Sequence, residues 1–146
     1  MTIKLLDCVT LDQAREQGLI PWQDELPELG SYWYKVYRDA YPVTPGHLLF
    51  VPTYDNSIAV QHAFEQAYIL GKKMCDSGAI QGFNIGMNLG HAAGQTVMYP
   101  HIHLIPRRAG DCADPVGGVR GVIPGQANYK KIEYQNPNVS RTGTRL

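Results

Sequence analysis

The sequence predicts an α+β domain in which an antiparallel sheet carries one main helix on one of its faces. Three observations support this fold class. Short segments rich in aromatic and β-branched residues recur along the chain, and one longer segment has helical periodicity. The first two strand-like segments, residues 31–39 and 47–52, are so close in sequence that an antiparallel pair is expected. With 146 residues and no internal repeat, the chain suits one domain with a substantial core.

The first half of the chain is expected to form a short helix and then two strands. Thr10 has the side chain of a helix N-cap, and Gly18 is the residue type that most often ends a helix. Tyrosine, tryptophan and valine dominate the first strand, whereas Pro42, Pro45 and Gly46 turn the chain before the second. The predicted elements are a helix over residues 11–17, a loop over 20–30, a strand over 31–39, a turn over 40–46 and a strand over 47–52.

The middle of the chain supplies the main helix and a third strand. Asn56 or Ser57 can cap this helix, and Gly78 can end it. Apolar residues spaced three or four apart predict the face that the helix buries. These residues are Val60, Phe64, Ala67, Leu70 or Gly71, and Met74. Residues 83–88 are then expected to form a strand, and the glycine- and alanine-rich residues 89–94 a loop.

Alternating residue types between Gly94 and Arg107 predict the fourth strand. Side chains two positions apart on a strand share a face. The side chains expected on one face are those of Tyr99, His101, His103 and Ile105. Those expected on the opposite face, in the core, are Met98, Pro100, Ile102 and Leu104. The Cα atoms of the two histidines would lie roughly 6–7 Å apart at about 3.3 Å per residue, which is comparable to the width of a hydrogen-bonded phosphoryl group.

Composition limits the partners and the compartment. Thirteen basic residues balance thirteen acidic ones, so no bulk charge attracts nucleic acid or an anionic membrane. No apolar run approaches the ~20 residues that span a bilayer, and the N-terminus has no signal-peptide pattern. The three cysteines are odd in number and widely spaced, as is typical of reduced thiols. We therefore expect a cytoplasmic protein that binds neither nucleic acid nor membranes.

The C-terminal quarter has a different character from the rest. From Ala109 onward the sequence is rich in glycine and shows little periodicity. We therefore expect residues 1–108 to form one domain and residues 109–146 to form an irregular tail that belongs to the same domain.

Small residues before the histidine strand predict an anion-binding site. Residues 86–94 contain three glycines, whose neighbouring backbone N–H groups can approach phosphate oxygens closely. Asn88, Gln95 and Thr96 add side-chain donors at the same end of the strand. A dinucleotide-binding fingerprint is excluded because this loop leads into a strand rather than a helix.

The histidines also leave other interpretations open. His47, which begins the second predicted strand, could join His101 and His103 in a zinc site. No acidic or thiolate residue flanks the His101/His103 pair at ligand spacing, and the neighbouring loop suits phosphate better, so we expect no metal. Isolated histidines are also common at surfaces, which is how we interpret His62 and His91.

Three separate segments together resemble the histidine triad (HIT) superfamily. The segments are residues 41–52, 83–90 and 94–107, and the resemblance covers about residues 39–111, half of the chain. The family motif is His-φ-His-φ-His-φ-φ, where φ is apolar and the middle histidine is the nucleophile. The middle histidine falls on His101 and the third on His103, whereas Tyr99 occupies the place of the first. Pro100 resembles the proline of the His-Pro-His motif in the nucleotidyltransferase branch.

The resemblance implies a role for each candidate residue and an HIT-like fold. His101 and His103 would be catalytic, with His47 as an upstream supporting histidine. Asp39 would bind the ribose hydroxyls. The residues that would hold the phosphate are Asn88, Gly94, Gln95 and Thr96. Tyr99 would replace the missing histidine as a hydrogen-bonding partner or fill space, and we expect packing. The family also implies a homodimer that joins two sheets.

The implied activity is hydrolysis at the α-phosphate of a purine nucleotide or dinucleoside polyphosphate, through a covalent nucleotidyl-His101 intermediate. Residues 114–129 are also similar to bacterial relatives of the dinucleoside polyphosphate hydrolases. The protein itself would need no cofactor, and any divalent metal would arrive with the substrate. Two alternatives stay open. One is a phosphoramidase or nucleotidyltransferase with the same covalent step, and the other is a nucleotide-binding module without turnover.

Overall fold

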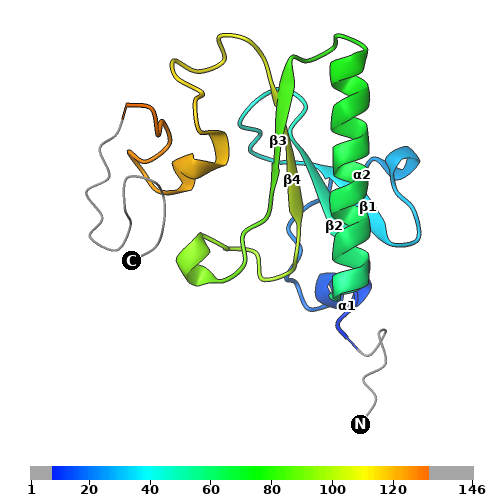
Figure 1. Ribbon diagram of the computed structural model, residues 1–146. Coiled ribbons are helices and arrows are strands. Elements are labelled where there is room, and N and C mark those ends of the chain that lie inside the picture. The colour runs from blue at the N-terminus through cyan, green and yellow to red at the C-terminus, as the bar shows by residue number, and fades with distance from the viewer. Residues whose placement is uncertain (1–7, 132–146) are drawn as a thin grey trace. The chain divides into compact units, whose positions relative to one another are not determined.

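A computed structural model describes residues 8–131 of the chain (Figure 1). The chain divides into two compact units, residues 1–109 and residues 110–146, and each is described by itself. None of the described helices is long and apolar enough to cross a membrane. Cys8, Cys75 and Cys112 form no disulfide with one another.

The first unit is built on a four-stranded antiparallel sheet with the strand order β1-β2-β4-β3. The strands are β1 (Tyr34–Arg38), β2 (Leu48–Pro52), β3 (Gly82–Gly86) and β4 (Ile102–Arg107). In the register, His103 of β4 lies opposite Leu49 of β2 on one side and Gly86 of β3 on the other. The predicted α+β fold with an antiparallel sheet and one main helix is confirmed.

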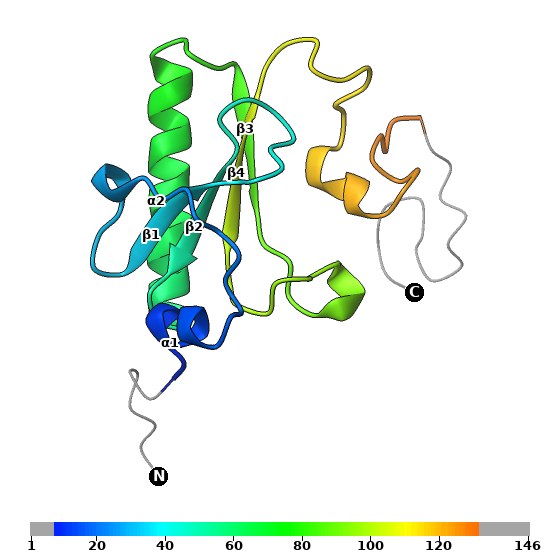
Figure 2. The same cartoon turned by 180° about the vertical axis from the view of Figure 1, so that it is seen from behind.

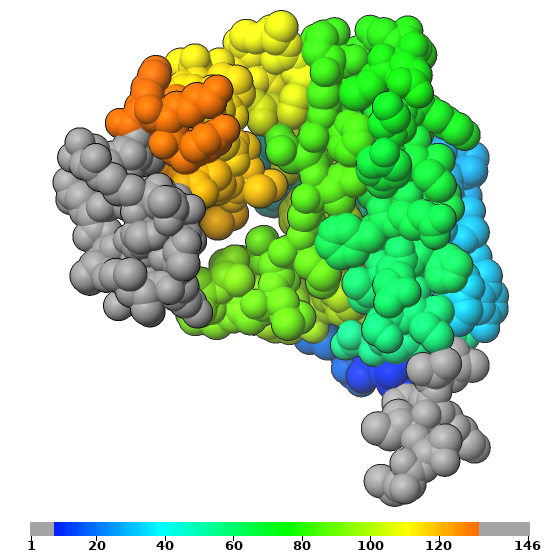
Figure 3. All heavy atoms as spheres, in the orientation of Figure 1, coloured from blue at the N-terminus to red at the C-terminus, as the bar shows by residue number. Residues whose placement is uncertain are grey.

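The main helix, α2 (Ser57–Asp76), packs along one face of this sheet. It lies in front of the strands in Figure 1 and behind them in Figure 2. In the space-filling view the atoms of α2 form a continuous surface over part of that face, and the atoms of β3 remain visible beside them (Figure 3). Asn56 caps the helix by accepting a hydrogen bond from the backbone N–H of Ala59, and Ser77 and Gly78 end it, as predicted.

The buried side of α2 differs from the predicted apolar stripe. Its buried residues are small and four apart: Ala59, Ala63, Ala67 and Gly71. The larger residues Val60, Phe64 and Leu70 flank this line and are only partly buried. Small side chains bring the helix close to the sheet, and a Cβ on Gly71 would lie 2.8 Å from the Phe83 ring. The predicted stripe is therefore confirmed in part: Ala67 and Gly71 are buried, and Val60, Phe64 and Leu70 pack against the core. The prediction missed Ala59 and Ala63, because a hydrophobic pattern gives little weight to small side chains.

A second apolar cluster covers the opposite face of the sheet. Tyr37, Leu49 and Val51 point to this face, because they alternate with Val36, Leu48 and Phe50, which pack against α2. The remaining members are Leu11, Ala14, Ile20, Trp22 and Tyr99. Helix α1 (Leu11–Glu16) contributes the first two, and Thr10 and Gln13 form a capping box at its start. Each fully buried large apolar side chain contributes about 1.5–3 kcal/mol to folding.

The fourth strand is shorter than predicted. β4 begins at Ile102, whereas residues 97–99 form a bend. Ile102, Leu104 and Pro100 are buried as expected, but Met98 is 54% exposed, so its predicted place in the core is wrong. Pro100 has no N–H to donate to a neighbouring strand, which explains why the ladder starts after it.

The second unit is described from residue 110 to residue 131. It has one short 3₁₀ helix, Gly118–Val122, and its described part has no strand. Arg120 Nε donates to the backbone carbonyl of Ala127 over 3.1 Å. Gly117 has φ = 93°, and any side chain there would collide with the same carbonyl group.

Candidate active site

The site centres on two imidazoles at the start of β4. His103 is the second residue of the strand and His101 immediately precedes it. Their ring centroids are 5.2 Å apart, and the ring planes are inclined to each other by 61°. Both rings lie on the sheet face opposite α2, since His103 is aligned with Leu49 and the intervening Ile102 packs into the α2 cluster. The prediction that the two histidines share one face is confirmed.

A backbone group sets the protonation of His101. Its Nδ1 lies 2.8 Å from the carbonyl oxygen of Tyr99. A carbonyl can only accept, so Nδ1 carries the proton and donates it, which leaves a lone pair on Nε2. The ring is 8% exposed and packs against Trp22 at a centroid distance of 4.7 Å. Burial lowers the pKa of His101 and so favours the neutral, nucleophilic form.

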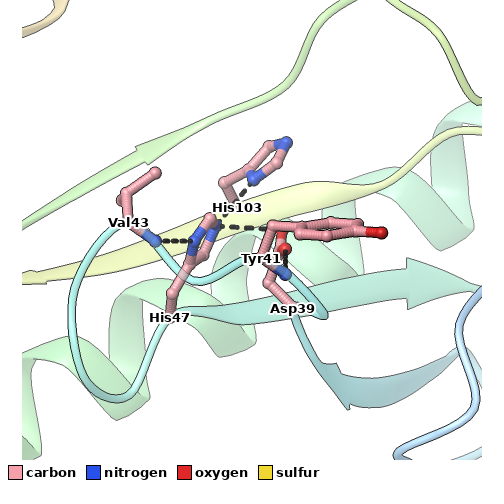
Figure 4. A network of polar contacts seen from close by, with 5 residues as sticks. All are labelled: Asp39, Tyr41, Val43, His47 and His103. Carbon is pink, nitrogen blue, oxygen red and sulfur yellow. Dashed lines mark hydrogen bonds and ion pairs between the residues drawn. The ribbon is translucent and has the colours of Figure 1, made fainter.

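A second backbone group sets the protonation of His47 and, through it, that of His103. The N–H of Val43 donates to Nδ1 of His47 over 3.2 Å, so the proton of a neutral His47 resides on Nε2 (Figure 4). That atom lies 2.9 Å from Nδ1 of His103 and donates to it. The proton of a neutral His103 therefore resides on Nε2, the nitrogen on the far side of its ring from His47 (Figure 4).

Burial keeps both of these histidines neutral. It lowers the pKa of His47, and the nearby carboxylate of Asp39 opposes this effect only in part. The pKa of His103 is lowered to about 4, first by burial and then by the neighbouring His101 and His47. At neutral pH the site therefore presents one acceptor, Nε2 of His101, and one neutral donor, Nε2–H of His103.

Asp39 joins the histidines from the end of β1. Its Oδ2 lies 3.5 Å from Nε2 of His47, and its Oδ1 accepts the N–H of Tyr41 over 2.8 Å (Figure 4). The side chain of Asp39 is 17% exposed. The structure thus brings together four of the predicted site residues, which are Asp39, His47, His101 and His103.

The glycine-rich loop connects β3 to the histidine segment. Its predicted ligands Gly94 and Thr96 are exposed, and Asn88 is half-buried. Gly90 and Gly94 have φ values of 91° and 87°, which favour glycine strongly. The loop starts beside the site, because Gly86 at the end of β3 is paired with His103.

Gln95 has a different local role from its neighbours. It is 7% exposed, its Oε1 accepts the N–H of Gly90 over 2.8 Å, and its Nε2 donates to the carbonyl of Val97 over 3.1 Å. Both ends of the amide thus hold the loop to itself, and we interpret Gln95 as a brace for that loop.

Three potential metal ligands lie close together at the site. One ligand atom each from Asp39, His47 and His103 lies within 4.8 Å of the others. This set differs from the three-histidine set that the sequence suggested, since Asp39 replaces His101. The Val43 hydrogen bond opposes a metal here, because it holds the proton on Nε2 of His47, the nitrogen that would have to bind the ion.

Tyr99 is a packing residue. Its side chain is 1% exposed and its hydroxyl donates to the carbonyl of Pro52 over 2.7 Å. Burial raises the pKa of this hydroxyl. The expectation that Tyr99 fills space is confirmed, and its backbone carbonyl is the group that orients His101.

Sequence reasoning missed two contributors. Trp22 belongs to the segment expected to be a loop, and its contact with His101 joins residues 79 positions apart. Val43 acts through its backbone N–H, for which the side-chain type gives no signal. Only the turn residues around it, Pro42 and Gly46, indicate that this backbone folds back on His47.

Several proteins of known sequence resemble this chain. A Mycobacterium tuberculosis protein named AP-4-A phosphorylase is 36% identical over 96 residues, which are 58% of this chain and 48% of that protein. An Arabidopsis thaliana protein named adenylylsulfatase HINT3 is 30% identical over 81 residues, 51% of this chain and 41% of that protein. The chain thus spans about half the length of these relatives or less.

Solved structures show the same fold. A Streptococcus mutans protein aligns with a TM-score of 0.55 and 26% identity, over 78% of this chain and 74% of that one. A zinc-bound histidine triad family protein of Mycobacterium smegmatis aligns with a TM-score of 0.57 and 24% identity, over 76% and 82% of the two chains. The family model described as "HIT domain" matches residues 34–110, more than half of the chain. This match spans all four strands, α2 and the histidine pair, and the chain belongs to the HIT domain family.

Proposed function

We propose that this protein is a nucleotide hydrolase that cleaves at the α-phosphate through a covalent nucleotidyl-His101 intermediate. In the first step the Nε2 lone pair of His101 attacks phosphorus, a P–N bond forms, and the P–O bond to the leaving group breaks with its electron pair on the departing oxygen. Water then attacks phosphorus and releases a proton to solvent, the P–N bond breaks with its electron pair returning to Nε2 of His101, and the nucleoside monophosphate leaves. One observation carries the proposal, namely the 2.8 Å contact between Nδ1 of His101 and the Tyr99 carbonyl, which leaves Nε2 available for attack.

His103 would stabilise charge during this step. Its Nε2–H is a neutral donor beside His101, and the ring centroids are 5.2 Å apart, so one phosphoryl group can contact both rings. A donor aimed at charge that develops in the transition state typically contributes about 10²–10³ in rate. His47 would act on His103 rather than on the substrate.

The remaining substrate contacts follow from the family resemblance. Asp39 would bind the ribose hydroxyls, since its carboxylate lies beside the histidines. Backbone N–H groups around Gly94, with the side chains of Asn88 and Thr96, would bind the phosphate oxygens. We keep Gln95 as the residue that shapes this loop.

The relatives support a nucleotide substrate. One is named for the phosphorolysis of AP-4-A and another as an adenylylsulfatase, so both names place the chemistry at a nucleotide. A purine nucleotide or dinucleoside polyphosphate is therefore the substrate class that we propose.

The direct test compares two histidine variants. His101→Ala should lower kcat/KM for diadenosine tetraphosphate by about 10³ or more, because it removes the nucleophile. His62→Ala is the matched control: His62 lies on α2, stacked on Trp33, and the control should keep the wild-type rate. Equal rates for His101→Ala and the wild type would overturn the proposal. Nucleotide binding without turnover by the wild type would favour the binding-module alternative.

We also propose a homodimer, as the family resemblance implies. Among the described strands, β3 is the edge strand whose outer side could join a second sheet, because the outer side of β1 is hydrogen-bonded to residues 24–26. Tyr32, which is 62% exposed, forms an aromatic cluster with Trp33 and Tyr54 beside β1. Light scattering coupled to gel filtration should give twice the mass of the chain, and a monomer at micromolar concentration would contradict the proposal.

A further inference from the structure

We propose that Arg15 and Trp22 are positioning residues for the nucleophile. Arg15, on α1, holds Trp22 in place, and Trp22 in turn holds the ring of His101 in the orientation that attack on phosphorus requires. The inference rests on the proposed function, and it adds to the site two residues from the N-terminal part of the chain, far in sequence from the histidines.

The ring of His101 needs more than its hydrogen bond to be fixed. The bond from Nδ1 to the Tyr99 carbonyl sets the tautomer, but a single hydrogen bond lets a ring swing about the contact. Two other rings restrict that motion. Trp22 packs at a centroid distance of 4.7 Å with its plane inclined by 58°, and His103 packs at 5.2 Å. Because a reacting group must be held within about 0.5 Å and 10–20° of its productive geometry, these contacts determine where the Nε2 lone pair points.

Trp22 is a large buried side chain on an irregular segment. It lies outside the described helices and strands, and yet it is only 7% exposed. Its ring packs against Tyr37 at a centroid distance of 6.2 Å as well as against His101. Tyr37 of β1 is aligned with Leu49 of β2, and Leu49 is aligned with His103 of β4. Tyr37 and His103 therefore share the sheet face on which Trp22 packs.

Arg15, in the last turn of α1, binds both Trp22 and its neighbour Tyr37 with one guanidinium. Nη1 donates to the carbonyl of Trp22 over 3.2 Å, and Nη2 donates to the hydroxyl of Tyr37 over 2.8 Å. The guanidinium is planar and presents its donors in a rigid fork. Binding two acceptors with this fork fixes the Trp22 backbone relative to the Tyr37 side chain.

The support behind Trp22 is itself attached to the sheet. On one side of Trp22, the N–H of Leu11 in α1 donates to the carbonyl of Thr53, which follows β2, over 2.9 Å. On the other side, the N–H of Leu26 donates to the carbonyl of Val36 in β1 over 2.8 Å. The segment that carries Trp22 is thus anchored before and after this residue, and Arg15 holds the residue itself.

The contact with Trp22 also keeps water away from the nucleophile. His101 is 8% exposed, and burial lowers its pKa, whereas the Tyr99 carbonyl and the Asp39 carboxylate act in the opposite direction. The other titratable group beside the ring is His103. Removing the indole would admit water to His101, so its pKa should rise toward the ordinary value of 6.5. A residue that only stabilised the fold would leave this pKa unchanged.

The kinetic test compares two variants in which methionine replaces a basic side chain. Arg15→Met should lower kcat/KM for diadenosine tetraphosphate about 10-fold or more, since a displacement of 1 Å in a reacting group costs up to about 10² in rate. Lys35→Met is the matched control, because Lys35 contacts the same segment at Glu25 through an exposed ion pair, and it should keep the wild-type rate. Arg15→Lys retains a charged donor and should recover part of the loss.

An NMR titration tests the positioning of His101 without any substrate. Trp22→Ala should raise the pKa of His101 toward 6.5, and Arg15→Met should shift it in the same direction. Trp22→Phe keeps an aromatic ring against the imidazole and should stay closer to the wild type. Arg15→Met leaves the Trp22 side chain in place, so it provides the decisive comparison if Trp22→Ala does not fold.

The two measurements separate this inference from the proposed function. If the wild type neither cleaves the nucleotide nor forms an adduct on His101, the proposed function fails, and the titration alone decides the positioning role. If the wild type is active and a folded Arg15→Met protein matches it in both kcat/KM and the pKa of His101, only the positioning inference is overturned.

Discussion

Nε2 of His47 lies 2.9 Å from Nδ1 of His103, and the Val43 amide on the other side of the His47 ring determines that the proton sits between them on His47. The two residues come from neighbouring strands, since His47 immediately precedes β2 and His103 lies in β4. His47 therefore sets the tautomer of His103.

His47→Ala should lower kcat more than it raises KM. The variant leaves Nδ1 of His103 without its donor, so both tautomers of His103 become accessible and the outward Nε2–H is no longer fixed. We expect kcat to fall about 10- to 100-fold, which is part of what one transition-state donor contributes. Steady-state kinetics with diadenosine tetraphosphate measures the change in kcat and the change in KM separately. A change confined to KM would show that His47 contributes only to binding.

The stability of the protein should depend on pH through His103. Its pKa is about 4 in the folded state, below the ordinary value of 6.5, so between these values the unfolded chain binds a proton that the folded chain does not. The contribution of His103 to the free energy of unfolding is therefore fully present above pH 6.5 and is lost as the pH falls toward 4. Allowing for the partial exposure of the ring, it amounts to about 2 kcal/mol.

His103→Asn removes this titration and keeps a polar side chain. Urea unfolding at pH 7 and pH 4.5 should show a smaller loss of stability on acidification for His103→Asn than for the wild type. If the stability of both proteins depended on pH in the same way, the low pKa of His103 would not be the cause of the loss.

The line of small residues on α2 predicts a packing defect for Gly71→Ala. The new methyl group would lie 2.8 Å from the Phe83 ring, and overpacking of this kind costs about 1–3 kcal/mol. Helix propensity alone would favour alanine by about 1 kcal/mol, so a net loss of stability shows that packing dominates. Combining Gly71→Ala with Phe83→Leu should recover part of the loss. Thermal unfolding measures the stability of the single and the double variant. A Gly71→Ala protein more stable than the wild type would show that α2 does not approach the Phe83 ring this closely.

Gln95 provides a test of the loop. Gln95→Ala leaves the Gly90 N–H and the Val97 carbonyl without their partner, at a cost of about 1–3 kcal/mol if they stay buried. Because the loop would bind phosphate, KM should rise several-fold while the nucleophile stays intact. Gln95→Glu keeps the acceptor for Gly90 and serves as the comparison. If the alanine variant matches the wild type in both KM and stability, Gln95 is not a brace.

Local patterns predicted most of the fold. Capping residues predicted where the helices begin, since the side chains of Thr10 and Asn56 accept backbone N–H groups at the starts of α1 and α2. Gly78, with its positive φ, follows the end of α2 as predicted. Alternation placed the two histidines on one face correctly, because the period of a strand is fixed.

The misses come from interactions that local patterns do not contain. Met98 fits the alternating pattern of the predicted strand and was therefore expected in the core. The strand begins only after Pro100, so Met98 lies in a bend instead. The buried line on α2 depends on how closely the sheet approaches, which hydrophobicity does not reveal. The tautomers of the site depend on two backbone groups, the Val43 amide and the Tyr99 carbonyl, whose positions exist only in the folded chain.

The most direct test of the proposed covalent mechanism is chemical trapping of a nucleotidyl adduct on the protein. Wild-type protein mixed with diadenosine tetraphosphate, quenched in the millisecond range and analysed by peptide mass spectrometry, should carry one adenylyl group on His101. His103→Asn should form the same adduct more slowly, and His101→Ala should form none. An adduct on another residue, or turnover by the wild type without any adduct, would contradict covalent catalysis by His101.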